Sequence, residues 1–109
     1  MIVSDIQDFN KKQVKVYING SFAFVLYKGE LRLYGIKKDK ELECRQYEEI
    51  TEKVLPKRCK LRAMNLLMTK SYTEYKMYEK LKAGLYSDAV IRDTISYLKS
   101  KRNIMKSYS

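Results

Sequence analysis

The sequence predicts an α+β fold that is mainly α: an N-terminal β-hairpin or small sheet with a covering helix, followed by a three-helix bundle. Two observations lead to this prediction. An alternating apolar pattern surrounds an Asn-Gly pair early in the chain, and residues 57–101 contain three segments of helical periodicity with their own start and stop residues. At 109 residues, the chain is expected to form one domain, or one small domain with an appendage.

Residues 14–26 predict the β-hairpin. Apolar and polar residues alternate on both sides of Asn19 and Gly20, a pair that supplies the positive φ angles of a two-residue type I′ turn. The residues expected on the inner face are Val14, Val16 and Ile18 in the first strand, and Phe22, Phe24 and Leu26 in the second.

The segments on either side of the hairpin are less regular. Residues 2–10 outline a further strand through Ile2, Ile6 and Phe9. The hairpin needs another strand or a helix because two strands alone are marginally stable in water. Residues 29–36 fit either a third strand or a single helical turn closed by Gly35.

Residues 43–55 predict a helix that covers the hairpin or braces the next helix. Tyr47, Ile50 and Val54 lie at i, i+3 and i+7, and the early acidic residues suit the start of a helix. Pro56 disfavours α geometry in the residue before it and suits the first turn of a new helix. We therefore expect an N-terminal region over 1–55, a three-helix region over 56–102 and a tail over 103–109.

The three-helix region has clear start and stop signals. Thr73 and Ser87 are expected N-caps of the second and third helices, and Gly84 is the expected left-handed stop between them. The tail is too short to form a packed element of its own. The expected buried stripes are Leu61, Met64, Leu67 and Met68 in the first helix, Met77, Tyr78 and Leu81 in the second, and Ile91, Ile95 and Leu98, with Val90 and Thr94 alongside, in the third.

The positive charge is concentrated in the helical part. The net charge is +10, of which residues 1–55 carry +1 and residues 56–109 carry +9. This asymmetry favours a surface that faces a polyanion, although lysine also serves as an ordinary solvating residue. The candidate contact residues are Lys57, Arg58, Lys60, Arg62, Lys76, Lys80 and Lys82.

The composition argues against an enzyme. The chain has no histidine, which removes the commonest general base and metal ligand, and no glycine-rich phosphate loop. Cys44 and Cys59 do not form a CxxC pair and are expected to be free thiols. We expect no catalytic residues, no cofactor and no metal.

The apolar segments are too short for a membrane protein. No run approaches the roughly 18 residues that a membrane-spanning helix needs. The N-terminus carries an acidic residue, Asp5, and lacks the apolar core of a signal peptide. The sequence therefore predicts a cytoplasmic protein.

The helical part also carries a familiar series of motifs. They are Ala63 with Leu67, Thr73-Glu74, Met77, Lys80-Leu81, Gly84, and Ile91 with Leu98. In this order and spacing they resemble the first three-helix repeat of the RecX family, regulatory proteins that modulate the RecA recombinase. The upstream VYINGSFAFVL and YGIKKDKEL segments and the helix over 43–55 look like the N-terminal region of Gram-positive members.

The chain departs from the family pattern in three ways. Met77 stands where the family usually has leucine, KRNIMKSYS replaces a Gly-Tyr-hydrophobic-Asp-Asp segment, and two further three-helix repeats are missing. The sequence is therefore interpreted as a truncated form of the family pattern.

The resemblance implies a protein that binds RecA, or the filament of RecA on single-stranded DNA, and lowers recombinase activity. Two alternatives remain. One is a general nucleic-acid-binding helical domain, in which Tyr72, Tyr75 and Tyr86 supply stacking surfaces for single-stranded DNA. The other is a remnant without full activity. We expect a monomer, or a weak dimer through an uncovered apolar flank of the third helix.

Overall fold

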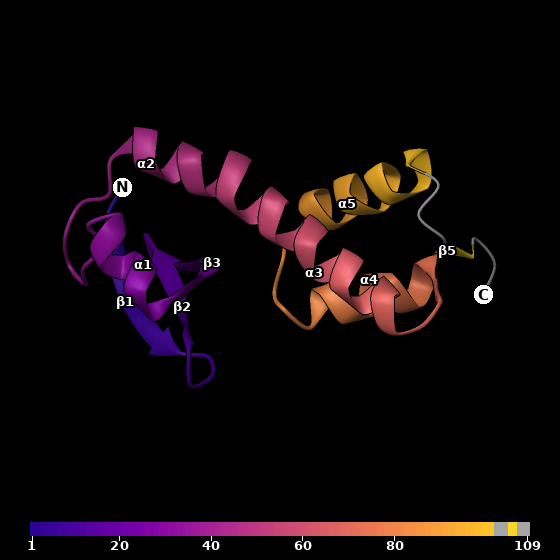
Figure 1. The fold of residues 1–109 in the computed structure, drawn as a ribbon. Coiled ribbons are helices and arrows are strands. Elements are labelled where there is room, and N and C mark those ends of the chain that lie inside the picture. Colours follow the sequence, from indigo (N-terminus) through magenta and orange to yellow (C-terminus); the bar gives the residue numbers. More distant parts are fainter. Residues whose placement is uncertain (102–104, 107–109) are drawn as a thin grey trace. The chain divides into compact units, whose positions relative to one another are not determined.

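The computed structural model describes residues 1–101 and 105–106 and confirms the α+β, mainly α fold class (Figure 1). The chain divides into two compact units, Met1–Thr51 and Glu52–Ser109. The first contains β1 (Val3–Asp8), β2 (Gln13–Ile18), β3 (Ser21–Tyr27), α1 (Lys28–Leu33) and α2 (Cys44–Glu49). A π-helical turn, η1 (Ile50–Val54), follows, and then α3 (Leu55–Thr69), β4 (Tyr72–Thr73), α4 (Glu74–Lys82), α5 (Asp88–Ser100) and β5 (Met105–Lys106).

The predicted hairpin is confirmed, and a third strand completes the sheet. β1, β2 and β3 form an antiparallel sheet in that order. The turn between β2 and β3 has φ angles of 51° at Asn19 and 85° at Gly20, as a type I′ turn requires. The core side of the sheet includes Val3, Val16 and Leu26, which are all fully buried.

A β-bulge changes the expected inner face of β3. Val16 pairs with Phe24, but the next residue, Tyr17, pairs with Phe22, so that Ala23 is the extra residue. The bulge turns Phe22 to the outer face, where it is exposed and its ring lies 5.9 Å from that of Tyr17 in an edge-on arrangement. The prediction that Phe22 points inward is therefore wrong, because strict alternation holds only while the register is regular.

The segment after the hairpin is helical, which decides between the two alternatives for residues 29–36. The Glu30 carboxylate accepts a hydrogen bond of 2.8 Å from the backbone N–H of Tyr27 at the start of α1, and Gly35 ends the turn with a φ of 65°. Residues 36–42 then run beside β1, since the N–H of Val3 donates to the carbonyl of Lys40 at 2.9 Å. This contact covers the start of β1 at one edge of the sheet.

Pro56 lies in the first turn of a helix, as predicted, but Leu55 before it is already helical, so the expected break in the helix does not occur. η1 ends at Val54, and α3 begins at Leu55 with Pro56 in its first turn. Proline lacks an N–H and its ring crowds the carbonyl four residues earlier. The wider spacing of a π-helical turn relieves such crowding, which explains why the helix widens immediately before the proline.

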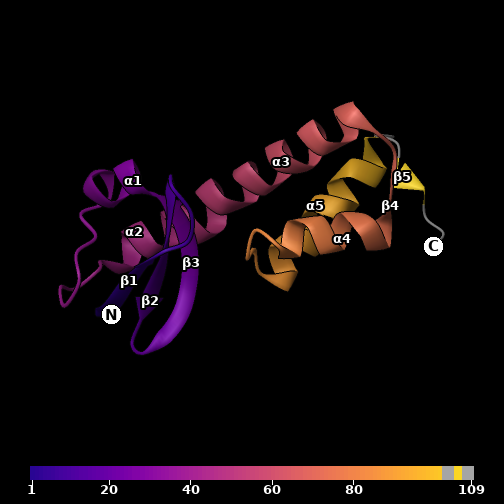
Figure 2. The same cartoon turned by 90° about the horizontal axis from the view of Figure 1, so that it is seen from below.

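The three helices of the second unit enclose one core. α3 contributes the residues Cys59, Ala63 and Leu66 at i, i+4 and i+7, and these are buried. They pack with Tyr72, Met77, Leu81, Ile91 and Leu98 from the following elements. Figure 1 and Figure 2 show α3, α4 and α5 lying against one another.

The buried face of α3 is not the one predicted. Leu61, Met64 and Met68 were expected inside, but their exposed fractions are 53%, 39% and 83%, while Leu67 is half-buried. α3 has two apolar stripes. The prediction placed the outer stripe in the core because its side chains are larger and more hydrophobic. The smaller side chains of Cys59 and Ala63 face inward because they let the neighbouring helices approach closely.

Both predicted N-caps are confirmed. The Thr73 hydroxyl accepts a hydrogen bond from the N–H of Lys76 at 3.1 Å, and the Ser87 hydroxyl accepts one from Val90 at 3.2 Å. Among the described residues, none of the large exposed apolar side chains lies on α5. The apolar flank expected on the third helix is therefore not exposed, and the exposed apolar stripe lies on α3 instead.

The turn between α4 and α5 uses its glycine differently from the prediction. Leu85, not Gly84, adopts the left-handed conformation, with a φ of 66°. A Cβ added at Gly84 would lie 3.1 Å from the ring of Tyr86. Gly84 therefore provides room for an aromatic ring rather than a positive φ angle.

Two short strands pair in the second unit. β4 pairs in parallel with β5, with Tyr72 opposite Met105 and Thr73 opposite Lys106 (Figure 2). β4 is the linker between α3 and α4, and it therefore accepts an extended segment along one edge. The rest of the predicted tail lies outside the described residues.

Both cysteines are free, and they lie in different environments. Cys44 is exposed at the start of α2, whereas Cys59 is buried on α3. Burial raises the pKa of the Cys59 thiol, and the neighbouring Thr94 hydroxyl offsets part of that shift. Cys59 is therefore a protonated core residue rather than a reactive thiol.

A cluster around Asp88 joins α4 to the start of α5. Its Oδ1 atom accepts hydrogen bonds from the Tyr78 hydroxyl at 2.7 Å and from Lys82 Nζ at 3.0 Å. These bonds, with that from Tyr78 the larger cause, lower the pKa of Asp88. The same contact with Asp88 raises the pKa values of Tyr78 and Lys82.

Replacing Met77 with alanine should reduce the free energy of unfolding by about 2–5 kcal/mol, because a fully buried side chain leaves a cavity. The matched change Met68→Ala, at an exposed site, should alter it by less than about 0.5 kcal/mol. Urea unfolding followed by circular dichroism measures both. Equal losses from the two variants would show that α3 or α4 buries a different face.

Replacing Asp88 with asparagine should make the melting temperature less sensitive to acid. A carboxyl whose pKa is lowered by folding stabilises the protein above its unfolded pKa of about 3.9, and this contribution is lost as the pH falls through the lower folded value. The advantage of the wild type over Asp88→Asn should therefore shrink below about pH 4. A constant difference in melting temperature from pH 7 to pH 2 would contradict this account.

Candidate interaction surface

The candidate contact residues lie on two helices of the second unit. On α3, Lys57 and Arg62 are exposed, while Arg58 and Lys60 are half-buried. An α-helix has 3.6 residues per turn, so Lys57 and Lys60 lie on one side of α3 and Arg58 and Arg62 on another. α3 therefore does not gather its four basic residues into one patch.

Lys60 is partly engaged within the unit. Its Nζ atom lies 4.8 Å from the centre of the Tyr97 ring on α5, and Lys101 Nζ lies 5.8 Å from the same ring. Both distances are within the range of a cation–π interaction. Lys60 thus contributes to the packing of α3 on α5 as well as to the surface charge.

The candidates on α4 separate in the same way. Lys76 and Lys80 are four residues apart and share one side of the helix, but Lys82 turns toward Asp88 and forms the ion pair described above. Lys76 lies 3.9 Å from Glu79, in an exposed pair of modest strength.

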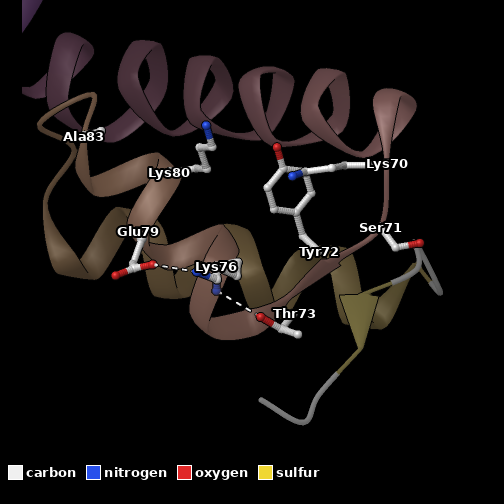
Figure 3. Close-up of a pocket in the computed structure, with 8 residues that line it drawn as sticks. All are labelled: Lys70, Ser71, Tyr72, Thr73, Lys76, Glu79, Lys80 and Ala83. Carbon is white, nitrogen blue, oxygen red and sulfur yellow. Dashed lines mark hydrogen bonds and ion pairs between the residues drawn. The ribbon is translucent and has the colours of Figure 1, made fainter.

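The structure brings Lys76 and Lys80 together with a third lysine, Lys70, around a pocket of about 400 Å³ (Figure 3). Sequence reasoning missed Lys70. Its position was nonetheless available from the sequence, because a linker of a few residues between the end of one helix and the cap of the next must lie beside the second helix. The pocket is lined by Lys70, Ser71, Tyr72, Thr73, Lys76, Glu79, Lys80 and Ala83.

Ion pairs reduce the number of available cations. Within the described residues, Glu74 pairs with Lys99 at 3.3 Å, Glu79 with Lys76 and Asp88 with Lys82. The exposed candidates that form no ion pair with another described residue are Lys57, Arg62 and Lys80.

The three tyrosines proposed as stacking surfaces differ in exposure. Tyr72 is only 6% exposed, and Lys70 Nζ lies 5.2 Å from the centre of its ring. Tyr86 is half-buried and packs against the core of the helical unit. Tyr75 is 60% exposed, so of the three it has the most accessible ring for stacking on a base.

The exposed side of α3 mixes basic and apolar residues. Lys57, Leu61, Met64 and Met68 follow one another at spacings of four, three and four residues, which places them in one row. Methionine is flexible and polarizable, and such residues suit surfaces that adapt to a partner. Sequence reasoning assigned the three apolar residues to the core and so did not identify this row as surface.

The described residues offer neither a metal site nor a membrane span. No group of three or more cysteine, aspartate or glutamate side chains within them is arranged to hold a metal ion. None of the helices in this part of the chain is long and apolar enough to cross a bilayer.

Comparison with known proteins identifies relatives of both the sequence and the fold. Residues 59–98 match the family model of the first three-helix domain of RecX. The "Regulatory protein RecX" of Caldanaerobacter subterraneus subsp. tengcongensis is 28% identical over 99 residues, which cover 91% of this chain and 50% of that protein.

A solved structure agrees with these sequence matches. A crystal structure of regulatory protein RecX superimposes with a TM-score of 0.50 and 21% identity over 94% of this chain and 51% of that one, and this likeness establishes the fold alone. The chain thus spans about half the length of the relatives it matches. The resemblance to the RecX family is therefore confirmed, and residues 59–98 match the family's first three-helix domain.

Proposed function

We propose that this chain is a regulatory protein that binds RecA, or the filament of RecA on single-stranded DNA, and lowers recombinase activity. The observation that carries the proposal is the match of residues 59–98 to the first three-helix domain of RecX. The similarity to a protein named "Regulatory protein RecX" supports the regulatory role. In this proposal the chain is not an enzyme, and it acts in the cytoplasm.

We assign binding to the three-helix region over residues 56–102. Its accessible cations, Lys57, Arg62 and Lys80, attract the acidic surface or the phosphates of the filament. The apolar residues beside Lys57 on α3 then supply close contacts. A chain bound in this way blocks filament extension or strand exchange by steric hindrance.

General binding to single-stranded nucleic acid is the second candidate. The net charge of +9 over residues 56–109 favours it. Two features oppose it: the first turn of α5 carries the carboxylate of Asp88, which repels phosphate, and the ring of Tyr72 is covered.

The chain should bind a preformed RecA filament more tightly than bare single-stranded DNA. Fluorescence anisotropy of labelled DNA, with and without RecA and a non-hydrolysable ATP analogue, measures both affinities. For bare DNA, the log–log salt slope should be about −0.7 for each phosphate contacted. The double variant Lys57→Glu/Arg62→Glu should weaken filament binding by roughly tenfold, since it reverses two accessible charges.

The exposed acidic residue Glu48 on α2 provides a control, because Glu48→Lys adds positive charge outside the helical unit and should leave filament binding nearly unchanged. Equal, salt-sensitive binding to the filament and to bare DNA would favour the general nucleic-acid binder. If neither is bound, the proposed regulatory activity does not reside in this chain.

A further inference from the structure

The pocket between the α3–α4 linker and α4 has the size and shape of a binding site. Its volume of about 400 Å³ is within the usual range for ligand pockets, which is roughly 300–1,000 Å³. One wall is the linker over 70–73, and the other is the side of α4 that carries Lys76 and Lys80 (Figure 3). Both walls belong to the same compact unit.

The charge of the pocket favours an anionic ligand. The lining includes three lysines, Lys70, Lys76 and Lys80, and one carboxylate residue, Glu79. Glu79 lies 3.9 Å from Lys76 and so offsets one of these charges. Lys70 is held over the ring of Tyr72, and Lys80 forms no ion pair with another described residue.

The walls of the pocket also favour an apolar group on the ligand. Ala83 and Tyr72 line it together with lysines, whose side chains have apolar methylene stems. Tyr72 is almost completely buried, and the ammonium group of Lys70 lies over its ring. The ring is therefore not an open surface on which a nucleobase can stack.

The backbone beside the pocket is extended and paired with another segment of the chain. The two residues of β4, Tyr72 and Thr73, line the pocket and at the same time pair in parallel with β5. One edge of β4 is therefore occupied by an extended segment of the chain itself, and a bound peptide would reach the pocket through its side chains.

We propose that this pocket binds an acidic peptide segment in which an aromatic or aliphatic side chain is flanked by carboxylates. The apolar side chain enters between Tyr72 and Ala83, and the carboxylates contact Lys70 and Lys80. This proposal rests on the proposed function, because it assumes that the chain binds a partner. It assigns the pocket to a protein segment of that partner rather than to nucleic acid.

The test uses a fluorescein-labelled hexapeptide with one phenylalanine among glutamates. Anisotropy should show saturable binding to the wild-type chain. The double variant Lys70→Gln/Lys80→Gln should raise the Kd by about tenfold, which corresponds to about 1.4 kcal/mol. The matched variant Lys11→Gln/Lys12→Gln removes the same charge from exposed positions outside the pocket and should change the Kd by less than about twofold, since exposed charges at a distance are screened by salt.

Several results would overturn the proposal that the pocket binds an acidic peptide. Equal weakening by the two double variants would show non-specific attraction, and so would equal binding of a peptide with alanine in place of phenylalanine. Labelled oligo(dT) that binds through Lys70 and Lys80 more tightly than the peptide would make nucleic acid the occupant. Absence of saturable peptide binding by a wild-type chain with a cooperative melting transition would also reject the proposal.

The same variants separate this proposal from the proposed function. If the chain binds the peptide through Lys70 and Lys80 but does not bind the RecA filament, the pocket proposal stands and the proposed regulatory function is rejected. If the chain binds the filament but not the peptide, the proposed regulatory function stands and the pocket proposal is rejected.

Discussion

The helical unit depends on the contact that α3 makes through two small side chains, Cys59 and Ala63. Both are fully buried, and α3 packs against α4 and α5. Small residues at such a contact bring the helix axes close together, and Leu66 completes the buried stripe one turn further along. The larger apolar residues of α3 then remain on the outside, where they are available to a partner.

The local signals at the hairpin turn and at the helix N-caps were reliable, whereas the left-handed stop expected at Gly84 and the signals that depend on packing were not. The turn at Asn19 and Gly20 and the caps at Thr73 and Ser87 follow from a few adjacent residues, and all were predicted correctly. The buried face of α3 depends on which of its two apolar stripes packs against α4 and α5. Hydrophobicity alone favoured the outer stripe, which is exposed. Phe22 shows the same limit, since one extra residue in β3 reverses the face on which it lies.

The distribution of charge could be predicted only in part. The sequence shows that the second half is strongly basic, but it does not show that Lys82 pairs with Asp88. Sequence reasoning also passed over Lys70, which becomes notable because a short linker places it beside Lys76 and Lys80. The grouping arises from the three-dimensional arrangement of short elements, and a list of basic residues does not contain that information.

The contrast between the two cysteines makes the native chain convenient for site-specific labelling. A maleimide dye at neutral pH modifies thiolates, so the exposed Cys44 will accept it while the buried Cys59, whose pKa is raised, stays unmodified in the folded state. A single fluorophore or spin label can thus be attached to the first unit without removing any cysteine. The second unit, which carries the candidate surface, keeps its natural chemistry throughout such an experiment.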